Sequence, residues 1–216
     1  MLNNNVRYVV QRIFQLSDQA VICMFNRLFA KRYTDADRVV RCWETDREFS
    51  IWMTIGGGDH YRCQIRLANG FPQIYVFDKG RGCRTLSVRA CTLTAYSARR
   101  LEKEGLIVFV PLLFCCFAEN EEDFYRKREQ LKYFIFHDIV WALHDSMKKG
   151  DLNVYDVQKL KQLCGHMAWK FLNRVEWMQS LELQELLMEA FQVDVDFLER
   201  IHQQELEDIR NKRMEN

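Results

Sequence analysis

Long hydrophobic runs are missing from the sequence. The longest apolar stretch, Leu106 to Ala118, contains Pro111 and falls well short of the roughly 20 residues that a membrane-spanning helix needs. The N-terminal residues also lack the positive start, apolar core and small-residue cleavage site of a secretory signal. We therefore expect a cytoplasmic protein with no membrane partner.

Paired cysteine motifs are missing as well. None of the eight cysteines is separated from the next by two residues, which argues against a zinc site. Most of them lie in apolar segments of a chain that is large enough to fold without disulfides, so reduced, buried thiols are expected. The glycine-rich segment is not followed by Gly-Lys-Ser/Thr, and no serine nucleophile elbow is present, so neither a phosphate-binding loop nor a serine hydrolase is expected.

The composition instead favours a folded α/β protein. The 216 residues are 48% hydrophobic and 28% charged, which supplies enough apolar surface for one packed core and argues against disorder. Apolar residues at helical spacing predict helix over residues 5–32, with a break at Ser17-Asp18, where the hydroxyl or the carboxylate would cap a second helix. The triple glycine at 56–58 predicts a hairpin turn between two β-prone runs.

Strand and helix patterns divide the remaining sequence. Strands are expected at residues 50–55, 61–67, 73–77 and 85–93. Beyond them we expect a short helix from Ser97 to Glu104 that stops at Gly105, a buried apolar segment at 106–117, and helices at 121–149, 153–177 and 180–213.

The net charge of +1 conceals an asymmetry. The segment from Asp59 to Arg100 has eight basic and two acidic residues, whereas the segment from Glu176 to the end has eleven acidic and four basic residues. One segment would attract phosphates and the other would repel them. The alternative interpretation is that both segments are ordinary solvated faces.

Two segments carry a family resemblance. Residues 6–33 (VRYVVQRIFQLSDQAVICMFNRLFAKRY) and residues 95–114 (AYSARRLEKEGLIVFVPLLF) resemble parts of bacterial PD-(D/E)XK nuclease family transposases, which are related to the recombination-promoting nucleases. The resemblance spans most of the chain as a pattern of short motifs. It implies an α/β fold in which residues 1–118 form a nuclease-like core, a small mixed β-sheet flanked by helices. Residues 119–216 would form a helical C-terminal region packed on that core.

The resemblance also implies where a catalytic site would lie. In this family an Asp on one strand and a Glu-x-Lys or Glu-x-Gln on its hairpin partner bind Mg²⁺, which polarises the scissile phosphate and activates water. The corresponding residues here are Ser50, Gln64 and Arg66. Because a hydroxyl and a neutral amide replace two anionic ligands, we expect a degenerate nuclease with no metal and no cofactor. The family helix that follows the hairpin is also missing.

Three functions stay open. The first is a catalytically degenerate nuclease homologue that binds nucleic acid or a nucleic-acid-processing protein. The second is an active endonuclease with a rebuilt Mg²⁺ site, for which Glu44 and Glu48 are the fallback ligands. The third is an inhibitor from a phage or another mobile element that blocks a host defence nuclease, in the manner of an anti-CRISPR protein.

The charge pattern supplies candidate binding residues for two of these functions. Cations on and around the expected hairpin are the candidates for contact with nucleic acid: Arg62, Arg66, Lys79, Arg81 and Arg84. The acidic face of the last helix is the candidate for a protein partner, through Glu182, Glu185 and Glu189.

Overall fold

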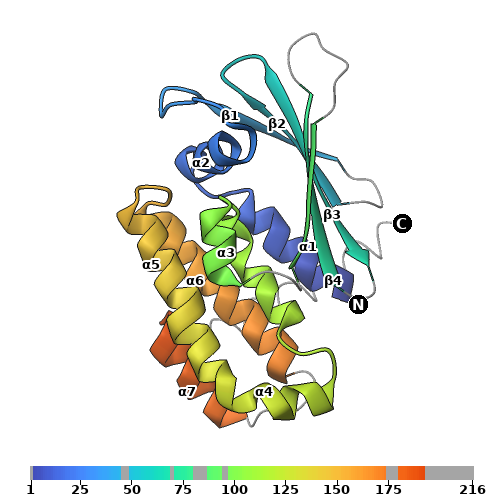
Figure 1. Ribbon diagram of the computed structural model, residues 1–216, viewed down its shortest axis with the longest axis vertical. Helices are drawn as coiled ribbons and strands as arrows, with labels where there is room; N and C mark the ends of the chain where they lie inside the picture. The colour runs from blue at the N-terminus through green and yellow to red at the C-terminus, as the bar shows by residue number, and fades with distance from the viewer. Residues whose placement is uncertain are drawn as a thin grey trace, which may run out of the picture.

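The structure is a computed structural model, and it describes residues 2–44, 49–68, 71–79, 87–93, 97–173 and 180–192. Five strands form one sheet with helices on one of its faces, and further helices extend the molecule away from the sheet (Figure 1). The expected α/β class is therefore confirmed. No helix within the described ranges combines the length and the apolar character needed to cross a bilayer.

The sheet is an antiparallel meander in the order β1-β2-β3-β4-β5. All four strand pairings are antiparallel, so the mixed sheet expected from the family resemblance is wrong. The cause is the short connections: each strand turns straight back beside its predecessor, whereas a parallel neighbour needs a long crossover. The strands are β1 (Val39–Glu44), β2 (Phe49–Ile55), β3 (Asp59–Ala68), β4 (Phe71–Asp78) and β5 (Ser87–Thr92).

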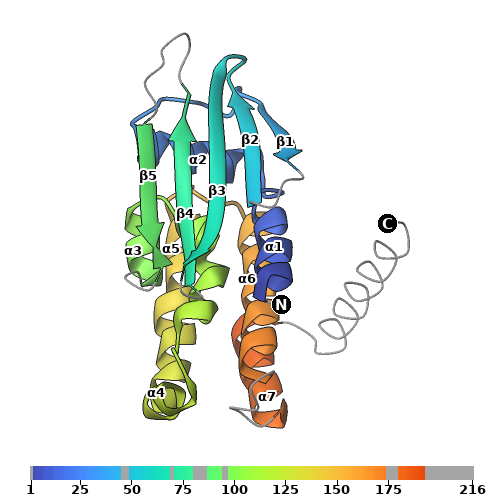
Figure 2. The ribbon, with the colours of Figure 1, turned by 90° about the vertical axis from the view of Figure 1, so that its right-hand side faces the viewer.

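The two N-terminal helices lie on one face of the sheet (Figures 1 and 2). They are α1 (Leu2–Ile13) and α2 (Asp18–Phe29), and the expected break between them is confirmed, because the Ser17 hydroxyl accepts a hydrogen bond from the Ala20 amide. Tyr61 on β3 packs against Phe25 of α2, with ring centroids 4.1 Å apart. The apolar side of the sheet and the apolar side of α2 thus bury each other.

A central apolar segment joins the sheet to the helices below it. After α3 (Ala98–Lys103) the chain turns at Gly105, whose φ of +76° and the closeness of Arg27 leave no room for a side chain. The 3₁₀ helix η2 (Ile107–Cys116) follows and is buried over nearly its whole length, as the sequence predicted. It contacts α1, α3, β4 and the later helix α6 (Val154–Ala168), so it forms the middle of the core.

The remaining helices form a bundle around η2. They are α4 (Glu121–Tyr133), the π-helix η3 (Phe134–Val140), α5 (Trp141–Lys148), α6 (Val154–Ala168), the π-helix η4 (Trp169–Asn173) and α7 (Ser180–Phe191). The expected helices are confirmed up to residues 173 and 191, and residues 193–213 lie outside the described part. One hydrophobic cluster includes residues from both sides of position 118, and the division into two regions there stays a prediction.

One buried carboxylate joins the first helical pair to the bundle. Asp156 is fully buried and accepts hydrogen bonds from the Ser17 amide at 2.8 Å and the Ser17 hydroxyl at 2.5 Å. It also forms a capping box with Asn153 at the start of α6. A single side chain therefore holds the beginnings of two helices that are far apart in sequence.

Removing this carboxylate is expected to destabilise the whole fold. Asp156→Ala should lower the free energy of unfolding by on the order of 3 kcal/mol, because it removes charged hydrogen bonds and leaves buried donors unsatisfied. Denaturation in urea measures the change. Asp35→Ala, at an exposed aspartate, is the control and should stay within about 0.5 kcal/mol of wild type. Equal stability of the two variants would show that the Asp156 links do not hold the helices together.

Candidate nucleic-acid interface

The sheet has one face on which no described helix lies (Figure 2). Side chains alternate along each strand, so every second residue of β2, β3 and β4 points to this side. We call this surface the outer sheet face. In the central three strands it consists of Ser50, Trp52, Thr54, His60, Arg62, Gln64, Arg66, Gln73, Tyr75 and Phe77.

Ser50 and Gln64, which the family resemblance assigned to the positions of metal ligands, lie side by side on this face. Ser50 and Gln64 are directly opposite in the β2–β3 pairing, which confirms the hairpin predicted from the glycine-rich turn. Both side chains are buried, at 2% and 1% exposure, and an Arg62 guanidinium nitrogen lies 3.3 Å from the Ser50 hydroxyl. The pair therefore fills space between larger side chains. Arg66, at the third family position, is exposed.

The fallback ligands receive no support from described contacts. Glu44 lies opposite Ser50 in the β1–β2 pairing, but its side chain is not among those described, and Glu48 lies outside the described residues. Within the described part of the chain, no group of three or more His, Cys, Asp or Glu side chains is arranged to hold a metal ion.

Cations and aromatic rings alternate across the outer sheet face. Lys79 lies 4.1 Å from the centre of the Trp52 ring, and the Arg62 guanidinium lies 5.5 Å from the same ring. The Arg66 guanidinium lies 5.4 Å from the Tyr75 ring. The sequence analysis had identified these three cations, and the structure brings them onto one surface. Arg81 and Arg84, the other two candidates, lie outside the described residues.

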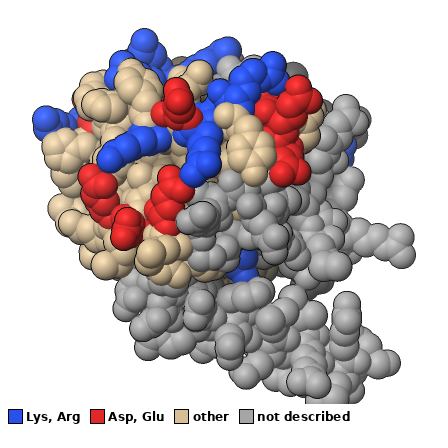
Figure 3. Space-filling model, turned by 90° about the horizontal axis from the view of Figure 1, so that it is seen from below, with Lys and Arg blue, Asp and Glu red and all other residues tan. Residues whose placement is uncertain are grey.

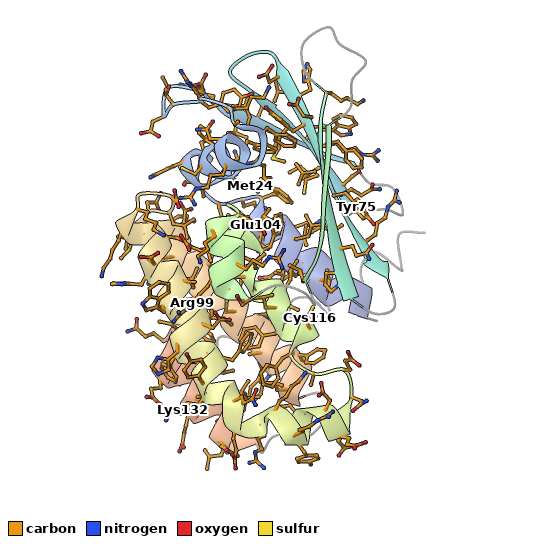
Figure 4. The ribbon with its side chains drawn as sticks, viewed as in Figure 1. Met24, Tyr75, Arg99, Glu104, Cys116 and Lys132 are labelled. Carbon is orange, nitrogen blue, oxygen red and sulfur yellow. The ribbon has the colours of Figure 1, made fainter. Side chains whose placement is uncertain are left out.

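The aromatic side chains of this face were not among the residues predicted from the sequence. The rings of Tyr75 and Phe77 stack with centroids 6.4 Å apart and an interplanar angle of 18°. Tyr75 and Met24 of α2 lie on opposite sides of the sheet (Figure 4). The signal was present in the sequence, because Tyr75 and Phe77 alternate with the buried Ile74 and Val76, but reading it requires the register of β4 against β3.

Acidic residues of the three central strands lie on the other side of the sheet. None of the described outward side chains of β2, β3 and β4 is acidic. Asp59 and Asp78 lie on the opposite, helix-covered side, where both form ion pairs with Lys31 at 3.5 and 3.3 Å. Alternation along the strands thus leaves the described outward side chains of β2, β3 and β4 with positive charges only, although β3 and β4 contain both signs of charge.

Two tyrosines lie beside Asp59 on the helix-covered side of the sheet. The Tyr33 hydroxyl donates to Asp59 and lies 2.6 Å from the Tyr61 hydroxyl. Burial, and after it the hydrogen bond to Asp59, raises the pKa of Tyr33 far above its usual range. Burial also raises the pKa of Tyr61. Two phenols that stay protonated are suited to a structural role and unsuited to acid–base catalysis near neutral pH.

Three buried or nearly buried cysteines are unsuited to nucleophilic attack. The side chains of six of the eight cysteines are described, and all six are free thiols: Cys23, Cys42, Cys63, Cys115, Cys116 and Cys164. Burial raises the pKa of Cys115 and of Cys164, and it raises the pKa of Cys116 to about 12. A thiol with so high a pKa is protonated at neutral pH and unreactive.

The acidic face of α7 is engaged with a neighbouring helix. Glu182 forms an ion pair with Arg128 of α4 at 2.7 Å, and Glu189 forms one with Lys132 at 3.8 Å. Glu185 lines the shallow groove between the two helices, whose volume is about 220 Å³. Seen from this end, basic and acidic side chains are intermixed (Figure 3). The three glutamates therefore do not form an isolated negative surface.

Comparisons with known proteins identify no relative. No family model matches the chain, and no match is found among curated proteins or solved structures.

The buried tyrosines predict how stability changes at alkaline pH. An unfolded tyrosine releases its proton near pH 10, whereas Tyr33 keeps its proton in the folded chain. The contribution of Tyr33 to the free energy of unfolding is therefore complete below about pH 10 and is lost as the pH rises further. Tyr33→Phe should show a shallower loss of stability between about pH 9.5 and 11.5.

The measurement is a series of urea unfolding curves across this pH range. Tyr125→Phe, at a half-exposed tyrosine on α4, is the matched control and should keep the wild-type slope. Identical slopes for the Tyr33 and Tyr125 variants would contradict the assignment. The overall stability of Tyr33→Phe is also expected to be lower by about 1–3 kcal/mol, because the Asp59 carboxylate loses its phenolic donor.

Proposed function

We propose that this protein is a non-catalytic, nuclease-like protein that binds nucleic acid through its outer sheet face. One observation carries the proposal: Arg62, Arg66 and Lys79 lie among aromatic rings on a surface where no described side chain of β2, β3 or β4 is acidic. Lysines and arginines that neutralise phosphates supply most of the affinity for nucleic acid. Aromatic rings beside them add contacts with bases that do not depend on sequence.

We propose, more specifically, that the fold is a nuclease scaffold whose metal ligands have been replaced. Support comes from the opposed positions of Ser50 and Gln64, which is the geometry that the family hairpin needs for its two carboxylates. Only residues 69 and 70 separate β3 from β4, so no helix follows the hairpin, as the sequence analysis expected. Neither Ser50 nor Gln64 supplies the negative oxygen ligands that Mg²⁺ prefers. We place the protein in the cytoplasm, where free thiols are stable.

The inhibitor hypothesis receives less support from the charges. A helix that imitates the charge of DNA needs a negative surface free of nearby cations. Instead, Arg128 and Lys132 pair with two of the three candidate glutamates on α7. A protein partner that processes nucleic acid stays compatible with the proposal, because such a partner and the nucleic acid can bind different faces.

The first test of the proposed function is the salt dependence of binding. Arg62→Ala and Arg66→Ala should each weaken binding to nucleic acid and lower the logarithmic salt slope by about one, the amount expected for one lost phosphate contact. Fluorescence anisotropy at several salt concentrations measures both effects. Lys132→Ala, on the far end of the molecule, is the control and should leave the slope unchanged. Unchanged slopes in both arginine variants would remove the basis for the proposal.

The second test concerns cleavage. Neither Mg²⁺ nor Mn²⁺ is expected to support efficient cutting of plasmid or linear DNA, because a hydroxyl and an amide occupy positions 50 and 64. Gel electrophoresis after prolonged incubation is the measurement. Efficient cutting that disappears in Glu44→Ala or Glu48→Ala would establish the active endonuclease and contradict the non-catalytic function.

A further inference from the structure

The spacing of the rings on the outer sheet face bears on the kind of nucleic acid that fits. Trp52, Arg62 and Phe77 lie in one row across β2, β3 and β4, because each pairs directly with the next. Neighbouring strands are about 4.8 Å apart, so the backbones that carry the two rings are about 10 Å apart. Tyr75 lies on β4 in the adjacent row, opposite Gln64. The face thus offers aromatic surfaces on two sides of a central cation.

Stacked bases do not match this spacing. Successive bases in one strand of a duplex are about 3.4 Å apart and have their faces against one another. Trp52 and Phe77, on strands about 10 Å apart, can each take the face of a different base only when those bases are unstacked and splayed outward. Extruding bases from a duplex costs several kcal/mol, whereas a single strand presents them freely.

The shape of the surface also argues against a duplex. The major groove is about 12 Å wide and admits a helix or a two-stranded ribbon. A five-stranded sheet is about 19 Å across, and β3, which holds Arg62 and Arg66, is its central strand. The arginines lie about 14 Å apart along that strand and do not stand on a projecting element. A duplex would therefore touch this face only with its outer backbone, without using the rings.

From these observations we infer that the outer sheet face binds single-stranded nucleic acid, with bases stacked on Trp52, Tyr75 and Phe77. The inference rests on the proposed function and names its substrate class. Arg62 and Arg66 lie between and beside the rings, where the phosphates that connect splayed bases would pass. Lys79, above Trp52, supplies a further positive charge at the end of this path.

The experiment compares labelled single strands of about 12 nucleotides, both oligo-dT and oligo-U, with a duplex of the same length. The single strands should bind on the order of tenfold or more tightly than the duplex at equal salt. Tyr75→Leu and Phe77→Leu should each weaken single-strand binding by on the order of tenfold and leave weak duplex binding unchanged. Circular dichroism and urea unfolding establish that each variant is folded.

Trp141→Leu is the matched control, because Trp141 is more exposed than the half-buried rings of the sheet and also has an arginine, Arg99, over its ring, but it lies on α5 away from the sheet. It should bind like wild type. A second readout uses a variant that keeps an aromatic ring at position 52. Single strands should quench tryptophan fluorescence in wild type. Trp52→Phe should remove most of that quenching and keep most of the affinity, because its ring can still stack.

The outcomes separate the two proposals. If neither single strands nor duplex bind, both the inference and the proposed function are wrong. If duplex binds at least as tightly as single strands, and the two leucine variants bind like wild type, the inference is overturned and the proposed function stands. Quenching that persists unchanged in Trp52→Phe would also overturn the inference, because it would place the bound strand elsewhere.

Discussion

The alternation of side chains along β3 is the constraint on which the rest of the molecule depends. Tyr61, Cys63 and Ile65 point toward the helices and are buried there, whereas Arg62 and Arg66 point outward. A slip of one residue in the pairing would send every one of these side chains to the opposite face. Burial of the apolar side chains therefore determines the register of β3. The register in turn places Arg62 and Arg66 on the outer sheet face, so the hydrophobic effect positions these polar side chains although it does not stabilise them directly.

At the edge of the sheet, β1 has no neighbouring strand on one side within the described part of the chain. Contacts from the start of α2 cover part of this edge. Asp18, the first residue of α2, accepts a hydrogen bond from the Val39 amide and pairs with Arg41, whose side chain donates to the Val39 carbonyl. The start of the edge strand β1 is thus covered by side chains, which discourages pairing with another chain. Because α2 is itself held at Ser17 by Asp156 of α6, the bundle, the helical pair and the edge strand support one another.

The sequence predicted those features that depend on nearby residues. The break at Ser17, the hairpin at residues 56–58 and the stop at Gly105 each depend on a cap or a turn that a few neighbours determine. The antiparallel order of the sheet and the pairing of α7 with α4 depend on contacts between distant segments, for which a single sequence has no direct signal. The rings beside the cations were missed for the same reason, since Trp52 and Phe77 meet Arg62 only through the register of three strands.

In the nuclease scaffold that we propose, uncharged residues at positions 50 and 64 have a consequence beyond the absence of metal ligands. In the nuclease scaffold that the sequence resembles, two carboxylates would stand beside Arg62 and Arg66, and without a bound cation they would neutralise both. Ser50 and Gln64 are uncharged and buried, so they add no negative charge beside the arginines. Under this proposal, replacing two carboxylates makes the net charge of the face that we propose meets phosphates more positive by two units. The proposed loss of catalysis and the proposed binding surface are then, in electrostatic terms, one change.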